Sequence, residues 1–292
     1  MRDFDENNIT QSVIERFANT PDPRLKTILN SLVTHLHDFI RDVDLTFDEW
    51  QTAIKFLTRT GQQCTDTRQE FILLSDTLGV SMLVDAVNHR QRNGATQTTV
   101  LGPFFVHEAP ALPLGANIAV NAEGEPLYAN GVIRSTNGKP LANATVDVWQ
   151  CNKDGFYDVQ LSPQLNLRAS FKTDQQGRFY FWSILPTSYP IPYDGPVGDL
   201  LTATNRHPYR PAHLHFMISA PEHETLVTHV FVKGDQYLDS DAVFGVKNSL
   251  IEEFKQHAPG TAPDGKQMPH SWRSFTYDFS LKAEHENLDH HP

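Results

Sequence analysis

The chain has 292 residues, 39% of them hydrophobic and 20% charged, as in a globular protein with room for one large core or two smaller ones. Its 24 basic and 35 acidic residues give a net charge of −11 without long runs of one sign, which argues against a nucleic acid or an anionic membrane surface as a partner. No segment has the apolar length of a signal-peptide core or a membrane span, and two cysteines, Cys64 and Cys151, are too few for a disulfide framework, so we expect a cytoplasmic protein.

The first hundred residues have helical periodicity. Apolar residues recur at three- and four-residue steps through residues 25–43, which predicts an amphipathic helix with one long apolar stripe. A capping-box pattern at Thr46 should begin a second helix that ends near Gly61, and a similar pattern at Thr67 should begin a third. The long stripe exceeds what one small helical layer buries, so we expect this helical domain, residues 1–100, to pack against another subunit.

The pattern changes after residue 100. Short runs rich in branched and aromatic residues follow, as in residues 131–135, 144–149 and 178–182, with glycines and prolines between them. Several short strands at this spacing favour an antiparallel β-sandwich over a parallel sheet. The expected fold class is therefore α+β, with an N-terminal helical domain followed by a β-sandwich domain at residues 101–292.

The β part contains two histidines with the spacing of metal ligands. His213 and His215 lie two residues apart in an apolar run, and a strand would direct both imidazoles to the same face. Pairs of this kind are often incidental. A carboxylate would be the usual third ligand, but the cupin position is Ala220, and no His-x-Asp or His-x-Glu is present in this run. Carboxylate sites are therefore disfavoured.

Tyrosine is the other candidate ligand near the histidines. The sequence offers Tyr157, Tyr189, Tyr193 and Tyr209. A tyrosine ligates as phenolate, and lowering its pKa from about 10 requires a strongly Lewis-acidic ion, which favours ferric iron over zinc or calcium. Each of these tyrosines could instead be an amphipathic residue at the rim of a sandwich.

Six stretches spread over nearly the whole chain match one known pattern. They are FILLSDTLGVSMLVDAVNH, TVLGPFF, ANATVDVWQCNKDGFYD, SYPIPYDGPVG, RPAHLHF and THVFVKGDQYLDSDAVFGVK. Through them the chain resembles the intradiol ring-cleaving dioxygenases of the catechol 1,2-dioxygenase family, and in particular the hydroxyquinol 1,2-dioxygenases.

The resemblance implies one non-haem Fe(III) per chain in the sandwich domain. Its four implied ligands are Tyr157, Tyr189, His213 and His215. Tyr189 is preferred over Tyr193 because it lies five residues before the Asp-Gly-Pro run at 194–196, as in the family. The family pattern also implies that Tyr189 leaves the metal when substrate binds and helps to remove its proton, and that Arg210 stabilises negative charge on the substrate ring.

The resemblance also implies a substrate pocket. Its lining would be Leu73, Asp76, Val100, Leu101, Gly102, Pro103, Phe104, Ile191, Pro192, Arg210, His229 and Val243. Phe104 and His229 are more similar to the hydroxyquinol and chlorocatechol branches than to the catechol branch, and Asp76 could accept a hydrogen bond from a third ring hydroxyl. The expected reaction is cleavage of benzene-1,2,4-triol to 3-hydroxy-cis,cis-muconate, the enol form of maleylacetate. The alternative is a catechol or chlorocatechol substrate that gives a cis,cis-muconate.

Relatives of this kind are homodimers joined through the N-terminal helices with lipid at the interface, so the resemblance implies both features here. Two competing functions use the same residues. The short β runs also resemble transthyretin-like sandwiches, many of which only bind ligands, and a sandwich alone says nothing about catalysis. A zinc hydrolase using His213 and His215 is the third possibility, but an acidic base near them is not evident.

Overall fold

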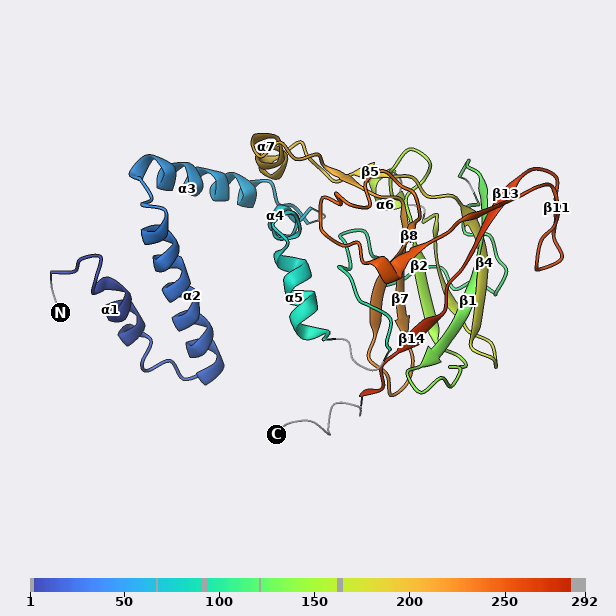
Figure 1. The fold of residues 1–292 in the computed structure, drawn as a ribbon, viewed down its shortest axis with the longest axis horizontal. Helices are drawn as coiled ribbons and strands as arrows, with labels where there is room; N and C mark the ends of the chain where they lie inside the picture. Colours follow the sequence, from blue (N-terminus) through green and yellow to red (C-terminus); the bar gives the residue numbers. More distant parts are fainter. Residues whose placement is uncertain (1–2, 67, 91–93, 121, 162–164, 285–292) are drawn as a thin grey trace. The chain divides into compact units, whose positions relative to one another are not determined.

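The computed structural model describes residues 3–66, 68–90, 94–120, 122–161 and 165–284 (Figure 1). The chain forms two compact units, Met1–Arg59 and Thr60–Pro292. Within the described ranges, no helix is both long enough and apolar enough to cross a membrane.

The first unit is helical. Its helices are α1 (Ile9–Arg16), α2 (Pro23–Asp42) and most of α3 (Phe47–Gln62). The capping box that begins α3 forms as predicted, because Thr46 N donates to Glu49 Oε2 at 2.9 Å and Glu49 N donates back to Thr46 Oγ1 at 3.3 Å. Thr10 of α1 contacts His37 of α2 at 3.0 Å, which ties these two helices together.

The apolar stripe of α2 is open in the single chain. Leu32 is 57% exposed and Phe39 is 51% exposed, and none of the described residues of α1 and α2 is buried. The side of the helix that the periodicity marks as inward-facing therefore has only partial cover within this unit, at residues such as Leu29 and Val33.

The second unit begins with two short helices where the sequence predicts one. They are α4 (Glu70–Thr77) and α5 (Val80–Asn88), separated at Gly79, whose φ of +73° lies in the left-handed region. Glycine adopts this conformation without steric cost, so it ends α4 and turns the chain into α5. Thr67, where the third helix was expected to begin, lies outside the described residues.

The rest of the second unit is a β-sandwich, which confirms the α+β fold class. One sheet has the order β10-β13-β1-β14 with β4 also paired to β1, and the other has the order β3-β2-β7-β8-β9. Their bounds are β1 (Pro126–Ser135), β4 (Arg178–Ile184), β10 (Lys255–His257), β13 (Trp272–Thr276) and β14 (Phe279–Leu281), then β2 (Thr145–Trp149), β3 (Arg168–Lys172), β7 (His213–Ser219), β8 (Leu226–Val232) and β9 (Ile251–Glu252).

Smaller elements complete this unit. They are α6 (Asp158–Leu161), β5 (Tyr189–Pro190), α7 (Pro196–Ala203), β6 (Tyr209–Arg210), the 3-10 turn η1 (Asn248–Leu250), β11 (Gly260–Thr261) and β12 (Gln267–Met268).

The sheets are mixed rather than wholly antiparallel. β13 and β14 both run parallel to β1, and β9 runs parallel to β8. Long connections lead into β13 and β9, so the chain can enter them in the direction of their partners, and β14 continues the path of β13 along β1 after Tyr277 and Asp278. The other ladders of the two larger sheets are antiparallel, as the spacing of the short strands predicts.

The core lies between the two sheets. Phe171, Phe179, Phe216 and Phe279 contribute rings that are at most 1% exposed, and the rings of Phe179 and Phe216 meet edge to face with centroids 6.0 Å apart. β7 enters this packed region with His213 as its first residue. β7 contributes Leu214 and Phe216 to this core, and because side chains alternate along a strand, His213 and His215 face the outer side of the same sheet.

Candidate metal centre and substrate pocket

The two histidines of β7 lie side by side on the outer face of this sheet. His213 and His215 are each 1% exposed, and their Nε2 atoms are 3.1 Å apart. Trp149 is the register partner of His215 on β2 and stacks on its imidazole with centroids 4.7 Å apart. The strand spacing thus directs both rings into one buried site, as the sequence predicts.

Tyr157 reaches the same site from a tight turn. Asn152 Oδ1 accepts from the backbone N–H groups of Asp154 and Phe156, which holds the turn closed. Gly155 has φ +84°, and a Cβ there would lie 2.7 Å from Tyr189 Cβ, so only glycine lets the turn pack against Tyr189. The Tyr157 Oη then lies 2.8 Å from His215 Nε2.

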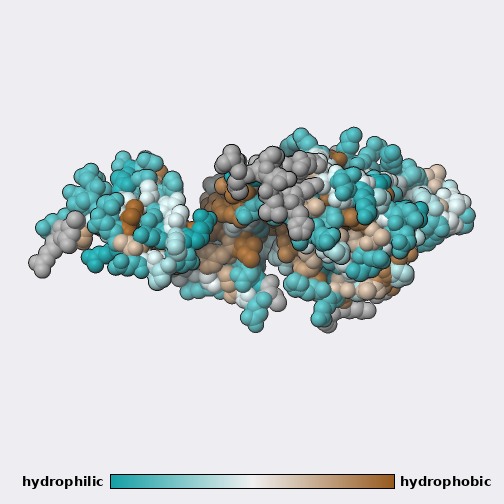
Figure 2. Space-filling view, turned by 90° about the horizontal axis from the view of Figure 1, so that it is seen from below, coloured by the Kyte–Doolittle hydropathy of each residue, from teal (hydrophilic) through white to brown (hydrophobic). Residues whose placement is uncertain are grey.

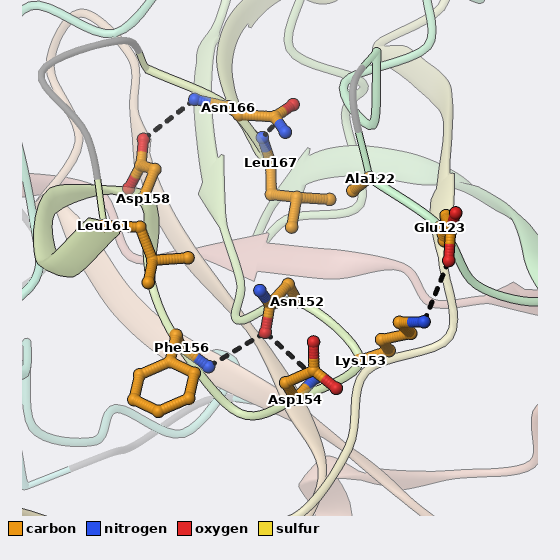
Figure 3. Close-up of a pocket in the computed structure, with 10 residues that line it drawn as sticks. All are labelled: Ala122, Glu123, Asn152, Lys153, Asp154, Phe156, Asp158, Leu161, Asn166 and Leu167. Atoms are coloured by element: carbon orange, nitrogen blue, oxygen red, sulfur yellow. Dashed lines mark hydrogen bonds and ion pairs between the residues drawn. The ribbon is translucent and has the colours of Figure 1, made fainter.

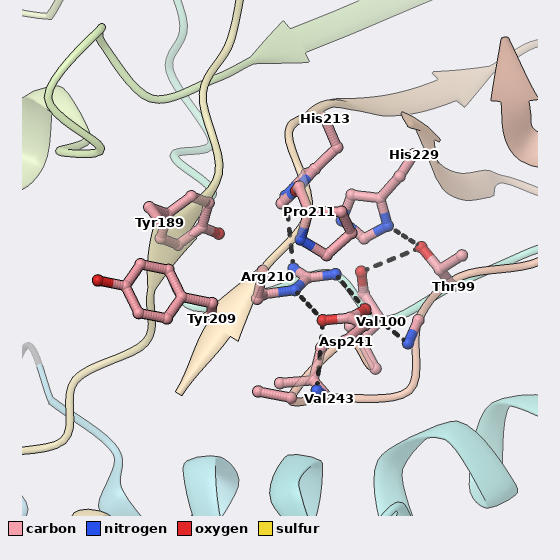
Figure 4. A network of polar contacts seen from close by, with 12 residues as sticks. Thr99, Val100, Tyr189, Tyr209, Arg210, Pro211, His213, His229, Asp241 and Val243 are labelled. Carbon is pink, nitrogen blue, oxygen red and sulfur yellow. Dashed lines mark hydrogen bonds and ion pairs between the residues drawn. The ribbon is translucent and has the colours of Figure 1, made fainter. Parts of the chain in front are cut away.

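Tyr189 closes the group. It is 4% exposed on the short strand β5, and its Oη lies 3.1 Å from that of Tyr157. In Figure 4 its hydroxyl points toward His213, whereas the hydroxyl of Tyr209 points the opposite way. Tyr209 instead stacks on Tyr237 at 4.8 Å, and Tyr193 is 59% exposed. The structure therefore brings Tyr157 and Tyr189 to the histidines and leaves the other two tyrosines outside the site.

Burial sets the protonation of these side chains. It raises the pKa of Tyr157 well above its ordinary value, with a further contribution from Tyr189, and it also raises the pKa of Tyr189. Burial lowers the pKa of His213 to about 3 and that of His215 well below its usual range. Both imidazoles are therefore neutral at pH 7, which is their metal-binding form, whereas each phenol needs a strong cation to lose its proton.

His229 is the third buried histidine at this site. A ring nitrogen of each of His213, His215 and His229 lies within 4.8 Å of the others, so a three-histidine metal group is also geometrically possible. His229 is the register partner of His215 on β8, which places their rings together with or without a metal. Its Nδ1 contacts Thr99 Oγ1, and its Nε2 has no hydrogen-bond partner. Both possible groups share His213 and His215, so a metal site at this end of β7 follows from either.

Arg210 lies beside the histidines and is paired with Asp241 (Figure 4). Its Nε is 3.1 Å from Asp241 Oδ1, its Nη2 is 3.4 Å from Asp241 Oδ2, and its Nη1 is 3.4 Å from His213 Nε2. Burial alone would lower the pKa of the guanidinium and raise that of the carboxyl, but the pairing reverses both directions. A fully charged arginine therefore sits inside the site.

The pocket residues expected from the sequence come from several elements. Leu73 and Asp76 of α4, Ile191 and Val243 are all less than 9% exposed. The pKa of Asp76 is raised by burial, while Ser81 and the charge of Arg210 oppose the rise. The carboxyl of Asp76 therefore lies within electrostatic reach of the Arg210 guanidinium.

The junction after residue 99 lies against the ligand rings. A Cβ on Gly102 would lie 3.2 Å from His215 Cε1, and Phe104 stacks on Tyr157 with centroids 4.4 Å apart. Val100 and Pro192 are partly buried, whereas Leu101 and Pro103 are exposed. These last two residues contribute less to an enclosed pocket than the resemblance implies.

A separate hollow of about 400 Å³ lies behind the Tyr157 turn (Figure 3). It is lined by Ala122, Glu123, Asn152, Lys153, Asp154, Phe156, Asp158, Leu161, Asn166 and Leu167, none of which is a candidate ligand. On its wall Asp158 pairs with Arg168, which also donates to Phe104 O at 3.0 Å. The Asp158–Arg168 pair therefore connects the Tyr157 turn with the junction, and the hollow itself lies apart from the candidate metal ligands.

The comparisons with known proteins show the family of this chain. A family model described as Dioxygenase matches residues 100–283, and one described as Catechol dioxygenase N terminus matches residues 22–96. The chain belongs to the intradiol ring-cleavage dioxygenases. The resemblance predicted from the sequence is therefore confirmed, and the transthyretin-like and zinc-hydrolase alternatives are not needed.

The similarity to individual relatives extends over nearly the whole chain of this dioxygenase. A 6-chlorohydroxyquinol 1,2-dioxygenase of Cupriavidus pinatubonensis is 54% identical over 89% of the chain and 95% of that protein. A hydroxyquinol 1,2-dioxygenase of Corynebacterium glutamicum is 50% identical, covering 94% of the chain and 93% of the relative. The crystal structure of a hydroxyquinol 1,2-dioxygenase from Pseudomonas putida matches with a TM-score of 0.90 at 49% identity, covering 96% of this chain and 99% of the other.

Sequence reasoning did not identify every residue that builds the site. It missed three residues that no metal-ligand motif contains. Asp241 pairs with Arg210, Thr99 contacts His229, and Trp149 stacks on His215. Trp149 could have been found as the residue opposite His215 once β2 and β7 were paired. Asp241 lies 31 residues after Arg210 in the chain, and no local pattern joins the two.

Proposed function

We propose that this dioxygenase cleaves benzene-1,2,4-triol, also called hydroxyquinol, between its adjacent hydroxyl-bearing carbons. Both atoms of O2 enter the product, 3-hydroxy-cis,cis-muconate, which is the enol form of maleylacetate. The observation that carries the choice of substrate is Asp76, a carboxyl that is only 6% exposed. Ser81 bonds to this carboxyl, and a third ring hydroxyl could donate to its remaining acceptor positions, which plain catechol would leave open at a cost of about 1–3 kcal/mol. The hydroxyquinol names of the relatives support the same choice.

The metal of this proposal is one Fe(III) per chain. Tyr157, Tyr189, His213 and His215 would hold it. Two buried phenols and two neutral imidazoles fit a hard, strongly Lewis-acidic cation, which would stabilise phenolates that burial alone disfavours. When bound, Fe(III) would draw electron density from the doubly deprotonated substrate and make its ring reactive toward O2.

The chain's own groups would handle protons and charge. Tyr189 lies on the two-residue strand β5, and we propose that its Oη accepts a proton from a substrate hydroxyl. Arg210 directs Nη1 toward His213 Nε2, so its charge lies where negative charge would build on the ring. His229, with a free Nε2 in the buried site, is available for a hydrogen bond to the substrate. Leu73, Ile191 and Val243 would exclude water around the ring.

Catechol or a chlorocatechol remains the alternative substrate. The Cupriavidus relative is named for a chlorinated hydroxyquinol, and a catechol 1,2-dioxygenase structure from Pseudomonas arvilla matches with a TM-score of 0.81 at 30% identity over 94% of this chain and 92% of that one. In those reactions the product would be a cis,cis-muconate or its chlorinated form, and Asp76 would lack its partner.

We also propose a homodimer joined through the N-terminal helices, with residues 1–100 as the association domain and residues 101–292 as the catalytic domain. The exposed stripe of α2 supports association, and bound lipid at the interface would cover apolar side chains that protein contacts leave open. The hydrophobic side chains of α4 and α5, visible in Figure 2, extend the apolar surface within the second unit. The free thiols Cys64 and Cys151 support a cytoplasmic location.

The test combines iron content, colour and substrate preference. We expect purified protein to contain about one iron per chain, to show the visible charge-transfer band of Fe(III)-tyrosinate, and to give a higher kcat/KM for benzene-1,2,4-triol than for catechol or 4-chlorocatechol. A preference for either diol would overturn the choice of substrate. Protein that neither contains iron nor can be reconstituted to a coloured form would overturn the four-ligand site.

A further inference from the structure

The Arg210 guanidinium has two of its three nitrogens fixed by one carboxylate. Asp241 faces Nε and Nη2 with its two oxygens, at 3.1 and 3.4 Å. A planar guanidinium held at two nitrogens cannot rotate, so the direction of its third nitrogen is also set. That nitrogen, Nη1, lies 3.4 Å from His213 Nε2.

Asp241 is itself fixed by its own turn. Its Oδ2 accepts from Gly245 N at 2.9 Å and its Oδ1 from Val243 N at 3.4 Å. The turn is attached to β6, next to Arg210, because Ala242 N donates to Tyr209 O at 3.1 Å. The five-residue turn 241–245 therefore holds the Asp241 carboxylate in place through two of its backbone N–H groups, and it presents the buried Val243 to the expected pocket.

A second carboxyl competes for the same arginine. Asp76 is 6% exposed and feels the charges of both Arg210 and Asp241, yet the described contacts of Arg210 include no hydrogen bond to it. An arginine released from Asp241 would find Asp76 as the next buried carboxylate, because a buried charge requires a partner. Such a pair would remove the acceptor offered to a third substrate hydroxyl.

We propose that Asp241 is a positioning residue with two effects, because it aims Arg210 Nη1 at the metal end of His213 and keeps Arg210 from pairing with Asp76. This inference rests on the proposed function. It makes Asp241 a residue on which both the rate of ring cleavage and the preference for the triol depend. Asp241 touches neither substrate nor metal in this scheme and acts only through Arg210.

The test follows the substrate complex rather than steady-state turnover alone. Enzyme and benzene-1,2,4-triol are combined without oxygen and then mixed with oxygenated buffer, and the decay of the coloured complex is recorded, which stays measurable in slow variants. We expect Asp241→Asn to slow this decay roughly 10- to 100-fold, as expected when a charged group loses its alignment, with iron content unchanged. The ratio of kcat/KM for triol to that for catechol should fall as well.

A double-mutant cycle separates positioning from a general effect on folding. In an Arg210→Gln background, Asp241→Asn should slow the decay by less than about threefold, because the two residues act as one unit. Wild-type decay in Asp241→Asn, or a full additional loss on top of Arg210→Gln, would overturn the inference. If the wild type forms no coloured complex with the triol, the proposed function fails instead.

Gly245 offers a probe that deletes neither partner. A Cβ there would lie 3.0 Å from Arg210 Nη2 and 3.2 Å from Asp241 Oδ2, so Gly245→Ala should displace the pair by a few tenths of an ångström. We expect a smaller slowing of the decay, roughly three- to tenfold. The matched control is Gly61→Ala, whose added Cβ would meet only Phe71 at 3.5 Å, an ordinary contact. Equal decay rates in these two variants would contradict the inference even if Asp241→Asn fails to fold.

Discussion

The β-sandwich and the N-terminal helical unit use the same apolar residue types in opposite ways. Leu127 and Phe216 in the sandwich are fully buried, whereas Leu32 and Phe39 on α2 are more than half exposed. In the sandwich, strands far apart in sequence cover each other's inner faces. In the helical unit, residues 1–59, most of the apolar stripe of α2 stays exposed. Periodicity alone shows which face is apolar, but only long-range packing decides whether that face is hidden.

The difference also separates two requirements for activity. A site that holds a charged arginine and neutral histidines needs a dry, rigid surrounding, which the sandwich supplies from its own residues. The helical unit has an exposed apolar surface, for which we propose a second subunit as the cover. Variants in each region should therefore fail in different ways.

The largest effect is expected from a ligand in the sandwich. Tyr157→Phe removes one of the two phenol oxygens from the buried group, so it should weaken the charge-transfer band, lower iron content, and reduce turnover roughly 1000-fold or more. Iron analysis and the visible spectrum measure this directly. Tyr193→Phe, on an exposed tyrosine of the Tyr189 loop, is the control and should keep colour and iron. A Tyr157→Phe variant with wild-type colour, iron content and turnover would exclude Tyr157 as a ligand.

The same truncation in the two regions should differ greatly in stability. Phe216→Ala leaves a cavity in the closed core and should lower the free energy of unfolding by about 3–5 kcal/mol. Phe39→Ala, 51% exposed, should cost less than about 0.5 kcal/mol when measured on dilute monomer. Urea unfolding of both variants makes the comparison. Equal losses would mean that the stripe is covered within the chain.

Dimer formation, in contrast to stability, should depend on the helical unit and not on the sandwich. Leu32→Glu places a charge on the apolar stripe and should raise the dimer dissociation constant roughly 100-fold, the size expected for a central interface residue. Light scattering over a dilution series measures it, and Ser31→Glu on the neighbouring exposed position is the matched control. A wild-type protein that is monomeric throughout the series would refute the proposed dimer.

The smallest effect concerns substrate preference. Asp76→Ala should lower the triol-to-catechol ratio of kcat/KM roughly tenfold, because the third hydroxyl loses its acceptor. Asp76→Asn keeps one acceptor oxygen and should retain part of the preference. Ile72→Ala, on the exposed side of the same helix, should leave the ratio unchanged. An unaltered ratio in Asp76→Ala would assign the preference to another residue.

The sequence predicts the local features of the fold well. The capping box of α3 and the short strands follow from turn chemistry and periodicity, which are properties of neighbouring residues. The break between α4 and α5 was missed, although Gly79 marks it, because a glycine within an apolar run can also continue a helix. The parallel pairing of β1 with β13 and β14 depends on connections that no local pattern describes.

The site divides in a similar way. The pairing of His213 with His215 was readable from strand spacing, since two residues on one strand face share a direction. The role of Tyr157 and Tyr189 as ligands came only from the family resemblance, and their convergence with the histidines supports it. Asp241 was not predicted, because its importance arises from one turn closing over Arg210, which only the folded chain shows.

The pairing of β1 with the last two strands has a consequence for biosynthesis. All four candidate ligands have been translated once residue 215 is made, but β1 waits for β13 and β14, which end at Thr276 and Leu281. Until then the sheet that contains β1 lacks β13 and β14, and the inner face of the other sheet is not fully covered. Contacts this distant in sequence form slowly and late. Completion of the sandwich therefore requires the chain through Leu281, although the four candidate ligands all precede residue 216.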